Sequence, residues 1–140
     1  MIVIEAGHEV RVIPTDGRPH PPSSVRQWLG DSKGHWEGNT LVVETTNFND
    51  KVAFRGASEN MKVTERFTRT GDETIRYEFT IDDPATWATP WTAELMFTTM
   101  DGPIFEHACH EGNYGIANTL AGVRAEEKRA AEAAAKKGTK

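Results

Sequence analysis

The chain of 140 residues has the length of one domain, and its 37% hydrophobic and 26% charged residues are typical of a soluble globular protein. Its formal net charge of −5 argues against nucleic-acid binding through bulk charge. A single cysteine, Cys109, excludes a disulfide within this chain and any zinc site that needs two thiolates.

The ends of the sequence carry no membrane signal. The N-terminal residues lack the basic region and the long apolar run of a signal peptide. No window of about eighteen apolar residues predicts a membrane-spanning helix. We therefore expect a soluble protein without a membrane partner, and the sequence leaves its compartment open.

Strand-like segments follow one another along the chain, separated by turn dipeptides. Gly38-Asn39, Gly71-Asp72 and Asp101-Gly102 supply the positive φ angles of tight hairpins, and Asp16-Gly17 gives a similar signal. Polar and apolar residues alternate almost perfectly over 62–81, which predicts an antiparallel pair with one buried face. The expected strands cover residues 2–5, 9–15, a segment around Trp36, 40–48, 62–68, 74–81, 91–99 and 103–109.

No helical period appears before residue 118, and the alanine-rich sequence from Arg124 onward favours a helix. We expect an all-β fold, an antiparallel meander that closes into a small lipocalin-like barrel or a two-sheet sandwich, with a C-terminal helical tail. The predicted domain boundaries are 1–118 for the β domain and 119–140 for the tail. The tail lacks a continuous apolar stripe, so we expect it to dock weakly.

Glu65 is the first candidate for a functional residue. The alternation places it on the same face as Val63 and Phe67, inside the expected barrel. A carboxyl group in apolar surroundings has a raised pKa unless it is paired, which suits a general acid or base. The alternatives are a buried carboxylate paired with an arginine and a bulge that turns the side chain outward.

A second candidate site is the segment from Glu106 to Gly115, which contains His107, Cys109 and His110. Imidazole titrates near neutral pH, so the histidines suit proton transfer or metal binding. On a strand the two rings point to opposite faces, which weakens a shared metal site, and we predict no resident metal. A thiolate at Cys109 is a further alternative, although a lone cysteine in a strand is more often a small core residue.

The loop at 16–21 presents Asp16, Arg18 and His20 between prolines that restrict its backbone. A rigid Arg and His at a barrel mouth are able to bind an anionic or carbonyl group. The alternative is a stiff connector in which Arg18 pairs with Asp16.

Four tryptophans, at positions 28, 36, 87 and 91, are candidates for the lining of a ligand cavity or for plugs at the ends of the barrel. The corner at 82–91 carries Asp82 and Asp83, whose carboxylates suit either a hard cation or a turn. The sequence contains no phosphate-binding glycine loop, no nucleophile elbow and no zincin motif. These absences argue against nucleotide-driven chemistry, serine hydrolysis and zinc proteolysis.

Several stretches of the sequence form a pattern: DGRPHP at 16–21, WLGDSKGHWEGNTLVVETTNF at 28–48, VTERFTR at 63–69, IDDP at 81–84 and PW at 90–91. Together they resemble an uncharacterised family of bacterial proteins that often carry an export signal. The resemblance covers about residues 8–115 and implies an exported or periplasmic protein. The positions that match the pattern are Asp16, Arg18, His20, Trp36, Glu37, Glu65, Arg66 and Trp91.

From these residues we expect a small-molecule enzyme that uses cofactor-free general acid–base chemistry, as a lyase, isomerase or hydrolase. Glu65 is the expected acid or base, with His110 or His20 as its partner. The alternatives are a non-catalytic ligand-binding protein and an assembly module whose tail or edge strand forms a homo-oligomer. The expected substrate-binding residues are Asp16, Arg18, Trp36, Arg66, Trp91 and His107.

Overall fold

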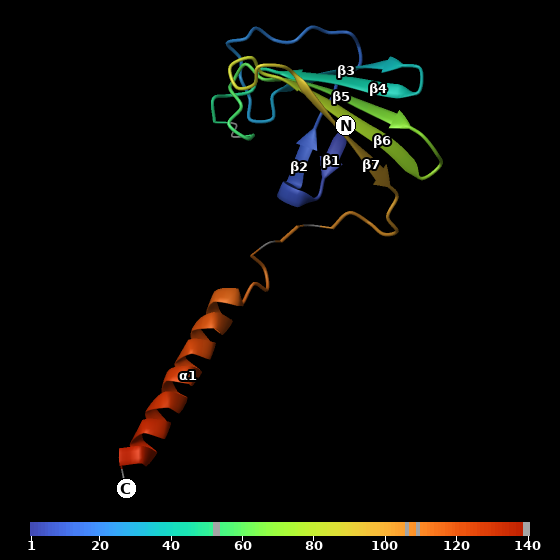
Figure 1. Ribbon diagram of the computed structural model, residues 1–140. Helices are drawn as coiled ribbons and strands as arrows, with labels where there is room; N and C mark the ends of the chain where they lie inside the picture. Colours follow the sequence, from blue (N-terminus) through green and yellow to red (C-terminus); the bar gives the residue numbers. More distant parts are fainter. Residues whose placement is uncertain (52–53, 106, 109, 139–140) are drawn as a thin grey trace. The chain divides into compact units, whose positions relative to one another are not determined.

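The computed structural model describes residues 1–51, 54–105, 107–108 and 110–138. The chain consists of two compact units, Met1–Phe105 and Glu106–Lys140. The first unit holds both β-sheets, and the second holds the C-terminal helix α1 (Figure 1). The fold is therefore mostly β, with antiparallel sheets and one C-terminal helix, as the sequence predicts.

A meander of five antiparallel strands forms the main sheet, in the order β3-β4-β5-β6-β7. Consecutive strands are neighbours, and short turns connect β3 to β4 and β5 to β6; Gly38, for example, has φ +61° in the β3–β4 turn. Within the described residues no ladder joins β3 to β7, so this sheet is open and is not a closed barrel. The strands are β3 Asp31–Glu37, β4 Thr40–Thr46, β5 Lys62–Arg69, β6 Thr74–Asp82 and β7 Trp91–Thr98.

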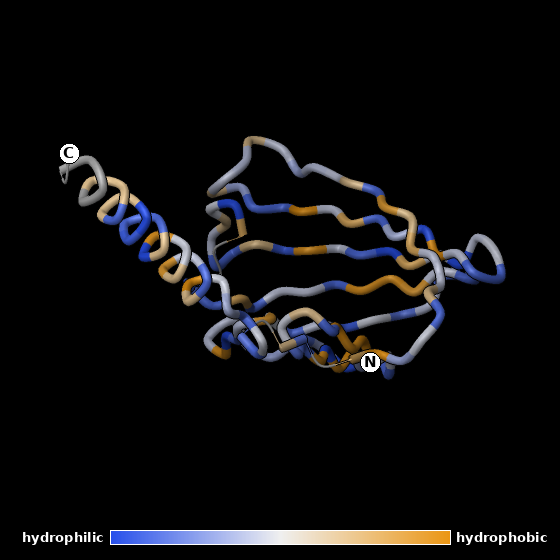
Figure 2. Tube along the Cα trace, turned by 90° about the horizontal axis from the view of Figure 1, so that it is seen from below, coloured by the Kyte–Doolittle hydropathy of each residue, from blue (hydrophilic) through white to orange (hydrophobic). Residues whose placement is uncertain are grey.

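The two faces of this sheet differ in chemistry, because residues directly opposite one another in the ladders point to the same side. One side, the polar face, carries charged and threonine side chains such as Lys33, Glu44 and Arg66. Apolar positions alternate with these polar ones along the strands (Figure 2). The other side, the apolar face, carries Trp36, Leu41, Val43, Val63, Phe67, Tyr77, Phe79, Ile81, Trp91, Leu95 and Phe97.

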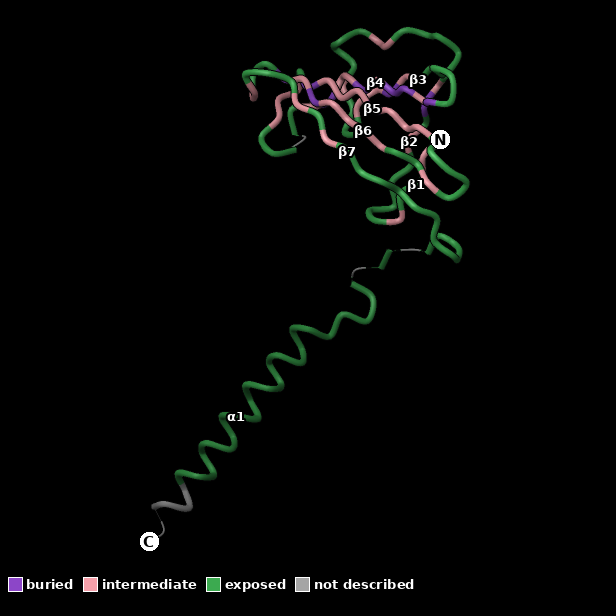
Figure 3. Tube along the Cα trace, turned by 45° about the vertical axis from the view of Figure 1, so that its right-hand side comes forward, coloured by how far each residue is buried: buried purple, intermediate pink, exposed green. Residues whose placement is uncertain are grey.

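A second, two-stranded sheet precedes the main one. It is the hairpin of β1 Ile2–Ile4 and β2 Glu9–Arg11, and its Arg11 bonds to side chains on the apolar face. The chain then runs along β3, where the Gly34 N–H donates to Pro14 O at 2.9 Å. Burial is concentrated on β3, β4 and the neighbouring strand ends, where Phe48, Met61 and Ile81 form a core cluster (Figure 3).

The structure corrects the prediction in three places. The strand expected at 103–109 is not formed by the described residues of that range, because the chain around Pro103 is exposed and the ladders give it no partner strand. The strand expected at 9–15 ends at Arg11. The helix α1 spans Gly115–Gly138 and begins before the tail predicted from residue 119.

Candidate functional site

The centre of the candidate site is Glu65, in the middle of β5. It lies on the apolar face, as the alternation predicts, opposite Val43 on one side and Phe79 on the other. Only 4% of its surface is exposed. A carboxylate buried among apolar residues needs a partner, because desolvation of an unpaired charge is costly.

Arg11 of β2 supplies that partner. Its Nη1 donates to Glu65 Oε1 at 3.0 Å and its Nη2 donates to Glu65 Oε2 at 2.5 Å, which is a bidentate ion pair. Nη2 also lies 3.2 Å from both Ser32 Oγ and Thr45 Oγ1, which bond to each other at 2.8 Å. The structure therefore shows the alternative that the sequence left open, a buried carboxylate paired with an arginine.

Tyr77 of β6 completes the cluster. Its hydroxyl donates to Glu65 Oε1 at 2.8 Å. Burial raises the pKa of Tyr77 and the nearby Glu65 carboxylate raises it further, so the phenol keeps its proton into the alkaline range. The bond to Glu65 raises the pKa of Arg11 and outweighs the opposing effect of burial. Glu65, Arg11 and Tyr77 are called the Arg–Glu–Tyr cluster below.

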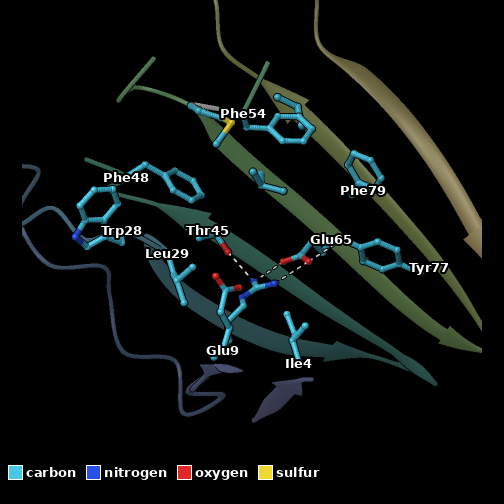
Figure 4. Close-up of a pocket in the computed structure, with 14 residues that line it drawn as sticks. Ile4, Glu9, Trp28, Leu29, Thr45, Phe48, Phe54, Glu65, Tyr77 and Phe79 are labelled. Atoms are coloured by element: carbon cyan, nitrogen blue, oxygen red, sulfur yellow. Dashed lines mark hydrogen bonds and ion pairs between the residues drawn. The ribbon is translucent and has the colours of Figure 1, made fainter. Parts of the chain in front are cut away.

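Two cavities meet at this cluster, between the hairpin and the apolar face. One has a volume of about 350 Å³ and extends toward Trp28 and Phe48 (Figure 4). The other has a volume of about 920 Å³ and extends toward Trp36 and Phe97. The residues that line both are Ile4, Arg11, Glu65 and Tyr77.

Aromatic rings form the floor of these cavities. The Tyr77 ring lies 4.8 Å from the Phe67 ring and 5.0 Å from the Phe97 ring, centroid to centroid, and 5.6 Å from the Phe79 ring. These spacings are typical of packed aromatic pairs. The row crosses β5, β6 and β7 and gives the site a long apolar wall beside its buried polar centre.

Comparison with family models, with curated proteins and with solved structures finds no match. None of the described helices combines the length and the apolar character that crossing a membrane requires. The site is therefore interpreted from its own residues.

The loop at 16–21 does not join this cluster. Asp16 and Arg18 form an exposed pair, in which Arg18 Nε lies 2.9 Å from both carboxylate oxygens. That hydrogen-bonded pair lowers the pKa of Asp16 to about 2. His20 Nδ1 lies 2.6 Å from Asp31 Oδ2, and its Nε2 lies 3.5 Å from Glu44 Oε1. Asp31 and Glu44 point to the polar face, so His20 and Glu65 lie on opposite sides of the sheet.

Arg66, another predicted binding residue, also lies on the polar face, where its Nη2 donates to Glu37 Oε2 at 2.7 Å. The four tryptophans fall into two groups. Trp28 and Trp36 line the cavities, whereas Trp87 and Trp91 pack against the core cluster. Trp91 is thus partly buried against this cluster, with its ring 5.8 Å from that of Trp87.

His107 and His110 belong to the second unit, and Cys109 lies outside the described residues. Across the part of the chain that the structure describes, no cluster of three His, Cys, Asp or Glu side chains is arranged to hold a metal.

Asp83 has a structural role: Ser58 N donates to its Oδ2 at 2.5 Å and Ser58 Oγ to its Oδ1 at 2.7 Å. Burial raises the pKa of Asp83, but these bonds and those from Ala85 and Thr86 lower it more. The turn interpretation of this aspartate therefore fits its contacts.

Sequence reasoning missed Arg11 and the bond that Tyr77 makes. Tyr77 was visible as an apolar-face residue, but its hydroxyl partner was not. Arg11 carried a weaker signal: a buried carboxylate at Glu65 demands a cation, and Arg11 alternates in phase with Ile13. The two partners are 54 positions apart, so no local pattern connects them.

Proposed function

We propose that the protein binds an uncharged, mainly apolar small molecule between the hairpin and the main sheet, which act as the two walls of a small sandwich. The observation that carries this proposal is the pair of cavities that meet at the Arg–Glu–Tyr cluster. Their volumes, about 350 and 920 Å³, match those of ligand sites, and a few polar groups in an apolar lining are typical of such sites.

The charges at the cluster favour an uncharged ligand. The Arg11 guanidinium is already neutralised by Glu65, and the Glu9 carboxylate also acts on it. A ligand carboxylate would add a third negative charge beside a single positive one, in surroundings where charge interactions are poorly screened. A hydroxyl or amide has no such cost, and it can donate to Glu65 Oε2, which accepts fewer bonds than Oε1 in this structure.

Acid–base catalysis at Glu65 stays a prediction that the geometry favours less. A general base needs a free lone pair aimed at the substrate. Oε1 of Glu65 already accepts bonds from Arg11 and Tyr77, so only Oε2 has a lone pair left for a substrate, and Oε2 is itself bonded to Arg11. Neither His20, on the polar face, nor Arg66 is placed to assist it.

The test uses Nile red, an uncharged apolar dye whose fluorescence rises in apolar sites. We expect saturable binding to the full chain, close to one dye per chain, and quenching of the tryptophan fluorescence. Ile75→Lys places a charge in the wall of the larger cavity and should weaken binding at least about tenfold. Ile116→Lys, on the exposed helix α1, is the matched control and should not. Absence of saturable dye binding would refute the proposal.

A competition experiment tests the charge argument separately. Decan-1-ol and decanoate have the same chain length, and at pH 7.5 only the second is charged. Decan-1-ol should displace the dye at concentrations about tenfold lower than decanoate. Glu9→Gln removes one negative charge near Arg11 and should narrow this difference. Better competition by decanoate would leave the cavity as a binding site but refute its preference for uncharged ligands.

A further inference from the structure

The two outer edges of the five-stranded sheet differ in how they are covered. Along β3 the chain segment before it lies against the edge: the Gly34 N–H donates to Pro14 O at 2.9 Å, and Ile13 is buried beside Gly34. That edge offers little space for another strand. The edge formed by β7 has no such cover among the described residues.

The hydrogen-bond phase of β7 shows which of its backbone groups point outward. Thr99 N donates to Glu73 O at 3.0 Å, and these two residues are opposite each other in the extension of the β6–β7 ladder. In an antiparallel pair the residues that bond to the partner alternate with those that bond away from it. The outward N–H and C=O groups of β7 are therefore those of Thr92, Glu94, Met96 and Thr98.

The side chains of β7 do not protect this edge. Natural edge strands usually carry lysine, proline, a bulge or an inward charge that discourages pairing. Here Leu95, Met96 and Phe97 are 52%, 54% and 43% exposed. The one charged residue, Glu94, points to the polar face, where its Oε2 lies 4.0 Å from Arg76 Nε. Among the described residues of the first unit, no segment pairs with the outer edge of this long and mainly apolar strand.

We propose that β7 pairs antiparallel with β7 of a second copy of this chain, so that the two sheets continue into one across a twofold axis. Leu95 lies on the axis, opposite Leu95 of the second copy. Thr92 is then opposite Thr98 of the second copy, and Glu94 is opposite Met96. Every outward residue has a partner, which gives about eight backbone hydrogen bonds between the copies.

This register fits better than the one shifted by a pair toward the N-terminus and better than those shifted by a single residue. Shifting the second strand by one pair toward the N-terminus places Glu94 opposite Glu94 of the second copy, where like charges repel. The same shift leaves the outward groups of Thr98 without a partner. A shift of one residue instead places apolar-face positions opposite polar-face positions. In the proposed register the apolar faces of the two copies are continuous through Leu95 and Phe97.

Sedimentation equilibrium of the full chain tests the dimer. We expect twice the monomer mass at micromolar concentrations. Met96→Pro removes one outward N–H without touching a bond to β6, and should weaken the dimer at least about a hundredfold. Leu95→Lys, which places two like charges on the axis, serves as the second variant. Circular dichroism and tryptophan fluorescence check that each variant is folded.

Ile116→Lys is the matched control, because it changes an exposed apolar residue of α1 and leaves β7 intact. It should sediment as the wild type does. A wild-type monomer at a concentration of about 0.2 mM would overturn the proposal. A dimer that persists in both β7 variants would also overturn it. Loss of the dimer only in Ile116→Lys would overturn it too, because the contact would then involve the helix.

Disulfide crosslinking tests the register itself, in a Cys109→Ser background. In the proposed register only the residue on the twofold axis lies directly opposite the same residue of the second copy, at a Cα separation that allows a disulfide. Leu95→Cys should therefore crosslink to itself under mild oxidation, and Glu94→Cys should do so far less. Efficient crosslinking of Glu94→Cys without that of Leu95→Cys would overturn the register, and failure of both would overturn strand pairing.

Discussion

The bond between Arg11 and Glu65 holds two charges inside an apolar site, so the loss of either charge is costly. Glu65→Gln keeps the shape of the side chain but leaves the buried guanidinium of Arg11 unpaired, and should lower the free energy of unfolding by about 3 kcal/mol. Urea unfolding at pH 7 measures it. The matched control is Glu37→Gln, which removes an exposed, solvent-screened pair with Arg66 and should leave stability almost unchanged. If Glu65→Gln and Glu37→Gln destabilised the protein equally, the burial of Glu65 would be contradicted.

The phenol of Tyr77 makes stability depend on alkaline pH. Its pKa is raised in the folded state, mainly by burial and then by Glu65. The folded chain therefore holds this proton more tightly than the unfolded chain, whose tyrosines titrate near pH 10. The stabilisation is complete below about pH 10 and is lost as the pH rises further.

Tyr77→Phe tests this dependence. It should cost about 1–2 kcal/mol at pH 8, because a hydrogen bond to a carboxylate is lost. It should also reduce the fall in stability between pH 9 and about pH 11, measured by urea unfolding at each pH. An identical alkaline fall in wild type and variant would show that Tyr77 does not hold its proton more tightly when folded.

At the scale of elements, the approach of β3 to β4 depends on Gly30. Its φ is +67°, and a Cβ there would lie 2.6 Å from Thr46 O, a backbone atom that cannot move aside cheaply. Gly30→Ala should therefore destabilise the fold by at least about 2 kcal/mol. Gly17 is the matched control: its φ is +77°, but a Cβ there meets nothing within 4 Å. Gly17→Ala should cost only about 1 kcal/mol in urea unfolding.

The strands were predictable where the sequence carries their period. In β5 and β6 one residue in two faces the core, and this alternation gives the hairpin and the face of Glu65. The sheet edges were not predictable, because they depend on contacts between distant segments. The sequence does not show that Pro14 covers β3, nor that Arg11 crosses to Glu65. The described residues of the expected strand at 103–109 form no strand for the same reason, since strand-like composition does not supply a partner.

Several candidate residues turn out to lie on opposite faces of the sheet, which the sequence did not show. Glu65 and Arg66 are neighbours in β5 and His20 lies in the loop at 16–21, and all three are titratable or charged. The ladder assigns the contacts of His20 and the pair of Arg66 with Glu37 to the polar face, and Glu65 to the other face. A buried charge is therefore informative about a site only when its side of the sheet is known.

At the scale of the whole molecule, stability should reside in the first unit. Every buried residue of the described chain lies within Met1–Phe105, whereas the side chains of α1 described up to residue 134 are exposed. A chain ending at Phe105 should therefore unfold at a temperature within about 3 °C of the full chain, as measured by tryptophan fluorescence. Its far-UV circular dichroism should lose the helical signal of the 24-residue α1. In the full chain, that helical signal should melt gradually and apart from the cooperative transition of the sheets, because a solvent-exposed helix gains little from tertiary packing. A large fall in the unfolding temperature of the shortened chain would instead show that residues 106–140 stabilise the sheets.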